Sequence, residues 1–343
     1  ISDDIDPAQT DNNHPSKNFG ITTYSGTLSS SGVAQITHGL GFKPDFIWSK
    51  GLTAGQRWAL RDSTRGPNQM LASDETTADA DKSSNGDMGS TFATDTTFPT
   101  NYTDGMNASS GTFVAHCWRA NGGTTATNSE GNHDCTLQAN AKAGFSIMTL
   151  GNYTSASGVT IGHGLDKAPS FYIHKSLSSS GNWHVYHSFL GATKALLLNS
   201  YNAAATAIGY WANTEPTADV LSLGNTFAGT SNGIVYAWAE VDGYSKFGGY
   251  EGNGNANGTF VYTGFRPRMI FVKDVDRGEY LQVFDSARNT YNPVDKGLSW
   301  NANSSESTGS GSGFDVDFLS NGFKMRCTHD NLNGSSTYVY GAW

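Results

Sequence analysis

One pattern of residues occurs three times in this 343-residue chain, and it limits the possible folds more than any other feature. Each copy has a proline, a lysine six residues later, and a tryptophan that ends a later β-favouring segment. The prolines are Pro44, Pro169 and Pro267, and the closing tryptophans are Trp118, Trp238 and Trp343. The same residues recurring in the same order indicate a repeated structural unit. A unit of about 100 residues has the size of one β-sandwich.

The residues that follow each proline predict a buried β-strand. The segments DFIWS, SFYIH and RMIFV are short, apolar and rich in aromatic and β-branched side chains, which favour strands. A proline at the entrance of a strand removes no hydrogen bond from the ladder. The stretches 72–112, 199–232 and 299–313 are rich in Ser, Thr, Asn and Gly and are predicted to be long loops with short strands.

We therefore predict an all-β protein made of three tandem β-sandwich-like repeats of antiparallel strands with long loops, at residues 21–120, 142–243 and 244–343. Residues 1–20 match none of the units and are predicted to form an extended N-terminal arm, and residues 121–141 a linker. A single body with the units around a pseudo-threefold axis is the alternative. Because the sequence opens at Ile1 without an initiator methionine or a secretory apolar segment, we expect a processed chain or an ordered fragment.

Composition and charge exclude several classes of protein. Charged residues are 15% of the chain, against about 25% in an average soluble protein, so hydroxyl and amide groups must cover the surface. The net charge of −9 and the lack of a basic stripe argue against nucleic-acid binding. No apolar run is long enough to predict membrane insertion. Three cysteines do not make a disulfide framework; buried thiols are favoured, with a Cys117–Cys135 bridge as the alternative.

Two of the copies share the motif D-S-x-R, formed by Asp62 with Arg65 and by Asp285 with Arg288. An aspartate at a turn can accept backbone N–H bonds while its carboxylate pairs with a nearby arginine. We therefore predict a structural latch within each loop, with a recognition loop as the alternative. The second copy has His187 in place of the aspartate and lacks the arginine.

Two further sets of matched residues lie around the end of the first strand. One set is a lysine at the end of that strand: Lys50, Lys175 and Lys273. A catalytic lysine needs burial and a depressed pKa, so these are predicted to be snorkelling lysines at a strand edge. The other set is an aromatic residue 14, 14 and 13 residues after the proline: Trp58, Trp183 and Tyr280. Trp58 and Trp183 follow loop residues and are the candidate glycan contacts. No catalytic residue, cofactor or metal site is predicted.

Several segments of the chain resemble a known family. The segment YEGNGNANGTFVYTGFRPRMIFVK, with the later FDSARN and FLSNGFKM, resembles a repeat domain of unknown function in large virion and tail-fibre proteins of bacteriophages. The segment DNNHPSKNF is similar to the one that precedes such domains. The resemblance covers most of the chain in three tandem copies, of which the second is the most divergent. It brings no established catalytic or ligand residues, and it implies an exposed virion component.

From the repetition and the resemblance we expect a non-enzymatic structural protein of a phage particle, an exposed tail-fibre or appendage component at the virion surface that attaches to host-surface glycan. Repeated binding faces convert weak contacts into avidity. The expected partners are other virion proteins, host glycan and further copies of the chain in a trimer or polymer, with residues 1–20 reaching into a neighbour. The alternatives are a capsid decoration protein, a subunit of an extracellular filament, and a virion-associated glycan-degrading enzyme.

Overall fold

The computed structural model describes residues 14–53, 55–103, 105–109, 111–153, 157–227, 232–307 and 313–343. Nearly all regular structure in these residues is β-strand in antiparallel sheets, which confirms the predicted all-β class. The described helical elements are short: η2 (Pro15–Lys17), η3 (Ser83–Asn85), η4 (Asn225–Phe227) and α1 (Asp330–Asn333). None of the described helices is long and apolar enough to cross a membrane.

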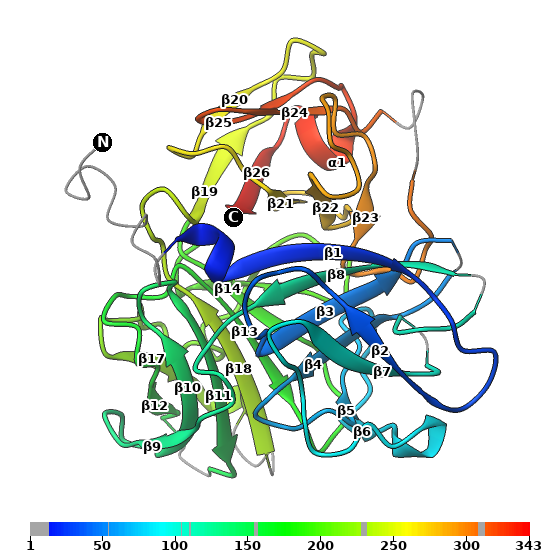
Figure 1. Ribbon diagram of the computed structural model, residues 1–343. Coiled ribbons are helices and arrows are strands. Elements are labelled where there is room, and N and C mark those ends of the chain that lie inside the picture. The colour runs from blue at the N-terminus through cyan, green and yellow to red at the C-terminus, as the bar shows by residue number, and fades with distance from the viewer. Residues whose placement is uncertain are drawn as a thin grey trace.

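Three large sheets form the frame of the molecule, and we call them the inner sheets (Figure 1). The first contains β1 (Phe19–Ser25), β3 (Phe46–Gly51), β4 (Trp58–Asp62) and β8 (Thr112–Trp118). The second contains β9 (Ala126–Asn128), β10 (Cys135–Asn140), β11 (Phe145–Gly151), β13 (Phe171–Ser176), β14 (His184–His187), β15 (Lys194–Leu197), β16 (Ala205–Thr206) and β18 (Asn232–Trp238). The third contains β19 (Lys246–Glu251), β21 (Met269–Asp274), β22 (Gln282–Asp285), β23 (Leu298–Ser299) and β26 (Thr337–Ala342).

A smaller outer sheet covers the other face of each inner sheet. The first outer sheet pairs β2 (Val33–Thr37) with β7 (Thr97–Asn101), and the second pairs β12 (Val159–Gly162) with β17 (Val220–Leu223). The third consists of β20 (Phe260–Tyr262), β25 (Gly322–Met325) and β24 (Val316–Leu319). A separate short pair joins β5 (Gln69–Met70) to β6 (Ala80–Asp81).

The inner sheets share one order of strands, β1-β8-β3-β4 in the first, β11-β18-β13-β14 within the second and β19-β26-β21-β22 in the third. The residue after each proline is fixed in the same way. The backbone N–H groups of Asp45, Ser170 and Arg268 donate to the carbonyl of the closing tryptophan of their sheet, at 2.8, 2.8 and 2.5 Å. Each proline therefore stands just before its strand, where its missing N–H leaves the ladder complete.

Alternate side chains of the strands after the prolines enter two different cores. On β3, Phe46 and Trp48 lie in a central core, whereas Ile47 packs under the first outer sheet. On β13, Ile173 lies in the central core and Tyr172 packs under the second outer sheet. Because both faces of these strands are covered, their sequence is a continuous apolar run rather than an alternating one.

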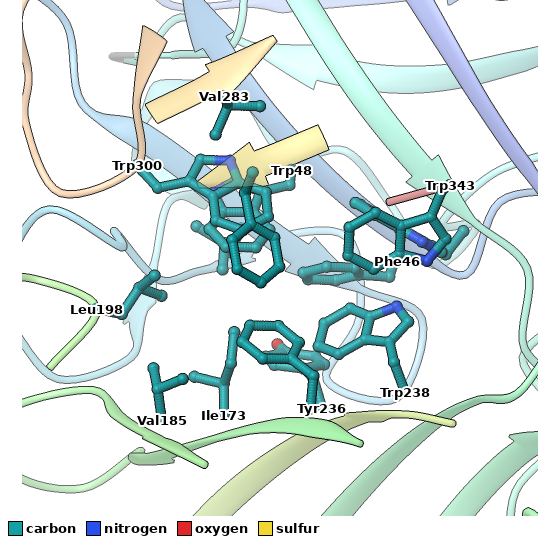
Figure 2. Packing of buried hydrophobic residues seen from close by; sticks show 14 of the residues in the cluster. Phe46, Trp48, Ile173, Val185, Leu198, Tyr236, Trp238, Val283, Trp300 and Trp343 are labelled. Carbon is teal, nitrogen blue, oxygen red and sulfur yellow. The ribbon is translucent and has the colours of Figure 1, made fainter. Parts of the chain in front are cut away.

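All three inner sheets contribute to the central core, and the closing tryptophans meet there. The ring centroids of Trp118, Trp238 and Trp343 lie 5.6–6.1 Å apart, with interplanar angles of 69–77° that are close to edge-to-face. Figure 2 shows Trp238 and Trp343 converging with Phe46, each from a different inner sheet. The three sheet pairs therefore pack as one body around a shared core.

Two predicted boundaries are wrong. Phe19 belongs to β1, is 1% exposed and pairs with Trp118, so the end of the predicted arm (1–20) is part of the first inner sheet. Residues 14–18 lead into β1 through η2, and residues 1–13 lie outside the described residues. The predicted linker (121–141) contains β9 and β10, which extend the second inner sheet. Strand β9 is mostly exposed, and β10 mixes polar with apolar residues, so neither has the continuous apolar run by which the other strands were predicted.

Candidate functional site

Neighbouring inner sheets contact each other through a residue at an equivalent position in each sheet. It is the last residue of β4, β14 or β22, the strand that follows the one after the proline. This residue is Asp62 on β4, His187 on β14 and Asp285 on β22. The carboxylate of Asp62 accepts a hydrogen bond from the Tyr236 hydroxyl of the second sheet at 2.7 Å. The carboxylate of Asp285 accepts one from Nε2 of His116 in the first sheet at 3.2 Å.

The second sheet contacts the third by a variant of the same arrangement. His116 and Tyr236 stand two residues before the closing tryptophan, and the third sheet has Gly341 at that place. A Cβ atom at Gly341 would lie 2.3 Å from the Phe271 ring, so no side chain fits. His187 instead donates through Nε2 to the adjacent carbonyl of Tyr340 at 3.1 Å. The three contacts thus close a ring from the first sheet to the second, to the third, and back to the first.

The D-S-x-R motif forms the contacts that its spacing predicts. In the first sheet, Asp62 accepts the backbone N–H groups of Thr64 and Arg65, and its other oxygen pairs with the Arg65 guanidinium at 2.6 Å. Arg65 also binds Asp79 at 2.6 Å, an acid that the motif did not point to. The Arg65 side chain is 4% exposed, so this ion pair is buried between the sheets.

The third sheet repeats this arrangement around Arg288, whose guanidinium binds Asp285 at 2.5 Å and Glu306 at 3.0 Å. Burial alone would raise the pKa of Asp285, but Arg288 and His116 together lower it well below its usual value. At the matched positions of the second sheet stand Leu190 and Ala204, so the arginine and the second acid are lost together. The buried aspartate and arginine of this motif therefore occur together in the first and third sheets, where they pair.

Loops after these strands reinforce the same junctions. The backbone N–H groups of Asp79, Ala204 and Glu306 donate to the carbonyls of Leu177, Val275 and Leu52 of the next sheet, at 3.0, 2.8 and 3.0 Å. The residue five positions before each of these donors also forms a hydrogen bond. Its side-chain oxygen accepts the backbone N–H at or just before the start of β4, β14 or β22. These pairs are Asp74 with Trp58, Asn199 with Trp183, and Asn301 with Leu281, at 2.9–3.0 Å. These equivalent hydrogen bonds therefore identify which residues occupy the same position in each of the three junctions.

The prediction that Trp58 and Trp183 contact glycan at the surface is wrong, because both side chains are fully buried. Their indole N–H groups donate across junctions, Trp58 to the carbonyl of Ser299 at 2.7 Å and Trp183 to that of Ala72 at 2.9 Å. Leu281 occupies the matched place in the third sheet, and Tyr280 precedes it with 46% of its surface exposed. The buried position is therefore always 14 residues after the proline, and it holds tryptophan in the first two sheets and Leu281 in the third.

The prediction of snorkelling lysines at a strand edge is also wrong. Lys50, Lys175 and Lys273 are at most 1% exposed and bind backbone carbonyls. Burial lowers the pKa of Lys175 and of Lys273 to about 8. Lys175 donates to Thr76 across the junction between the first and second sheets, so we assign it to the junction.

The large exposed hydrophobic side chains of the described residues are mostly aromatic: Tyr102, Phe189, Tyr201, Phe260, Tyr262, Tyr280 and Tyr291, with Val33 and Ile208. Two of them form a pair, since the ring centroids of Tyr201 and Tyr280 lie 6.5 Å apart with their planes inclined by 56°. Tyr201 was missed because it lies in a Ser/Asn/Ala-rich loop outside the repeated pattern. An aromatic residue in such a loop was the signal that could have identified it.

Other chemical sites were sought among the described residues. No three His, Cys, Asp or Glu side chains there are placed to hold a metal ion, and the three cysteines are buried free thiols. A polar cleft of about 340 Å³ is lined by Asn18, Arg119, Asn121, Asn140 and Lys142 among others. Its amide and cationic groups can bind polar ligands.

Buried histidines make the stability of this protein dependent on pH. Burial lowers the pKa of His184 and of His187 to about 4, and of His174 to about 3, where the charge of His184 adds to the effect. The unfolded chain takes up these protons near pH 6.5, before the folded chain does. Stability is therefore complete above about pH 6.5 and falls as the pH drops towards 4, by up to about 1.4 kcal/mol per pH unit for each histidine.

Urea unfolding of the wild type and of His187→Gln between pH 7.5 and 4.5 measures this dependence. In that interval the free energy of unfolding of the variant is expected to fall less steeply with decreasing pH, because its unfolding takes up about one proton fewer. Equal slopes for the two proteins would show that His187 is not the group that titrates.

Comparison with known proteins finds one family. A family model described as a domain of unknown function, DUF7483, matches residues 14–343. Neither the curated proteins nor the solved structures contain a match.

Proposed function

The chain belongs to the DUF7483 domain family, whose function is unknown. From the repeated sequence pattern, the resemblance to virion repeat domains and the exposed aromatic surface, we propose that it is a non-enzymatic structural protein of a phage particle that attaches to host-surface glycan. It acts as an exposed tail-fibre or appendage component, and further copies of the chain multiply the contact. Weak sites presented together bind far more strongly than one site alone.

One observation carries this proposal: large aromatic side chains stand in solvent on a surface that is otherwise polar and weakly charged. Tyr291, Tyr262 and Tyr201 are 83%, 65% and 58% exposed. Contiguous exposed apolar surface commonly marks a binding site, and Tyr201 adjoins a second exposed ring, that of Tyr280. Tyrosine offers a rigid apolar ring and a hydroxyl, which suits ligands that have both apolar faces and hydroxyl groups.

The use of the ionisable groups also supports a structural role. Asp62, Asp285, Arg65 and Arg288 are bound to one another or to neighbouring sheets, and each is at least nine-tenths buried. Glycan hydrolysis needs two carboxyl groups facing each other across a substrate cleft. The carboxylates of the two junctions face guanidinium groups instead, so they serve the assembly of the sheets.

Binding of fluorescently labelled protein to host cells tests the attachment role. Cells treated with periodate, which cleaves the vicinal diols of sugars, are expected to bind much less protein than untreated cells. Equal binding to both would overturn the glycan part of the proposal. Release of new reducing ends from host polysaccharide by the protein would overturn the non-enzymatic part.

Antibody labelling of intact particles tests the location. Label at the tail or an appendage supports the proposal, whereas label over the whole capsid shell would favour a decoration protein.

A further inference from the structure

We propose that Tyr201 and Tyr280 form a binding site for a neutral hexopyranose residue at the junction of the second and third inner sheets. This inference rests on the proposed function and names the ligand class and the residues. Tyr201 lies in the loop after β15 and is 58% exposed, and Tyr280 ends the loop before β22 and is 46% exposed. Both rings therefore keep a large part of their surface in water although they contact each other.

The other two junctions show that the fold itself does not need aromatic residues at these places. Tyr201 stands two residues after Asn199, whose side chain accepts the N–H of Trp183. The residues at the same distance from the equivalent acceptors of the other two junctions are Thr76 and Asn303. Tyr280 stands directly before Leu281, and the residues directly before the equivalent Trp183 and Trp58 are Asn182 and Arg57. All four matched residues are polar and exposed. An aromatic pair at only one of three equivalent junctions therefore indicates a role other than folding.

A single buried amide holds the two tyrosine loops in position. Asn301 is 8% exposed; its side-chain oxygen accepts the N–H of Leu281, next to Tyr280, at 3.0 Å. Its side-chain nitrogen donates to the carbonyl of Ser200, next to Tyr201, at 3.0 Å. The two rings thus have a fixed relation before any ligand binds, which reduces the entropy lost on binding.

The surroundings of the pair fit a sugar better than an apolar ligand. The Tyr201 ring packs on Gly278, where a Cβ atom would lie 3.2 Å from the ring, and 58% of the surface of Tyr201 stays exposed. An exposed aromatic ring can stack on the C–H face of a pyranose. Asn202 follows Tyr201 in the chain and is exposed, and Glu279 precedes Tyr280 and is half-buried. The two tyrosine loops thus carry an amide and a carboxylate, the groups that bind sugar hydroxyls.

Titration of the full chain with methyl glycosides of glucose, galactose and mannose and with their short oligosaccharides, followed by saturation-transfer NMR, tests the site. Tyr201→Ala and Tyr280→Ala are each expected to weaken binding about tenfold or more, since central aromatic side chains dominate such contacts. Tyr201→Trp should retain binding. Val33→Ala, which shortens an exposed aliphatic side chain on the first outer sheet, should leave it unchanged. Unchanged thermal unfolding of each variant shows that folding is intact.

A gain-of-function variant makes the test sharper. Thr76→Tyr combined with Asn182→Tyr places an aromatic pair at the first junction and is expected to increase the number of sugars bound per chain. Wild-type affinity in both alanine variants would overturn the site but leave the proposed function standing. Periodate-sensitive binding to cells without binding of any hexopyranose would do the same. Binding to cells that resists periodate would instead reject the glycan function itself.

Discussion

Replacing Arg288 by methionine is expected to lower the free energy of unfolding by about 3–5 kcal/mol. The Arg288 side chain is 1% exposed and neutralises Asp285, which is fully buried, and Glu306, which is 10% exposed. Without the guanidinium, two carboxyl groups are left in a site that water cannot reach. They must either stay charged without a counter-ion or take up protons, and both outcomes favour the unfolded chain. Urea unfolding at pH 7.5 measures the loss.

Two companion variants separate the buried ion pair from a general effect of removing an arginine. Arg326→Met removes a 45% exposed arginine that lies 3.4 Å from Asp317, and we expect a loss of about 0–1 kcal/mol. Asp285→Asn and Glu306→Gln added to Arg288→Met remove the unpaired charges and should recover part of the stability. If Arg288→Met costs no more than Arg326→Met, the junction does not depend on the ion pair.

Replacing Trp238 by alanine should destabilise the protein by about 3–5 kcal/mol, as expected for a large aromatic side chain in a core. The indole is 1% exposed and contacts Trp118 and Trp343 of the other inner sheets. It also packs on Phe145 and Phe171 of its own sheet at 5.0 and 5.3 Å. The cavity therefore opens where all three inner sheets meet, and calorimetry should show one transition at a lower temperature.

The matched control for this variant is Tyr291→Ala, because an 83% exposed ring makes little contribution to packing. Its effect is expected to lie within about 0.5 kcal/mol. Two separate transitions in Trp238→Ala, with only part of the chain melting early, would contradict the shared core. They would show that the sheet pairs fold independently.

Short-range features of this protein could be predicted from its sequence. The strands after Pro44 and Pro169 were evident because both of their faces are buried, which leaves a continuous run of aromatic and β-branched residues. The contacts of Asp62 with Arg65 were evident because they span three residues and depend on a turn. In both cases the informative residues are close together in the chain. The local sequence therefore indicates the strand in the first case and the turn contact in the second.

Contacts between distant segments decided the rest. Trp58 looked like a surface residue because loop residues precede it, but the carbonyl that its indole binds belongs to Ser299, 241 residues away. Asp79 and Glu306 carry no local sign that they will meet an arginine. Tyr201 and Tyr280 are 79 residues apart in the chain and become a pair because Asn301 and the bond from Ala204 to Val275 hold their loops together. The sequence by itself determined which segments become the central strands, since a strand covered on both faces has a continuous apolar run of its own. Only the tertiary structure decided which faces are covered and which aromatic rings reach water, because that depends on packing between sheets far apart in the chain.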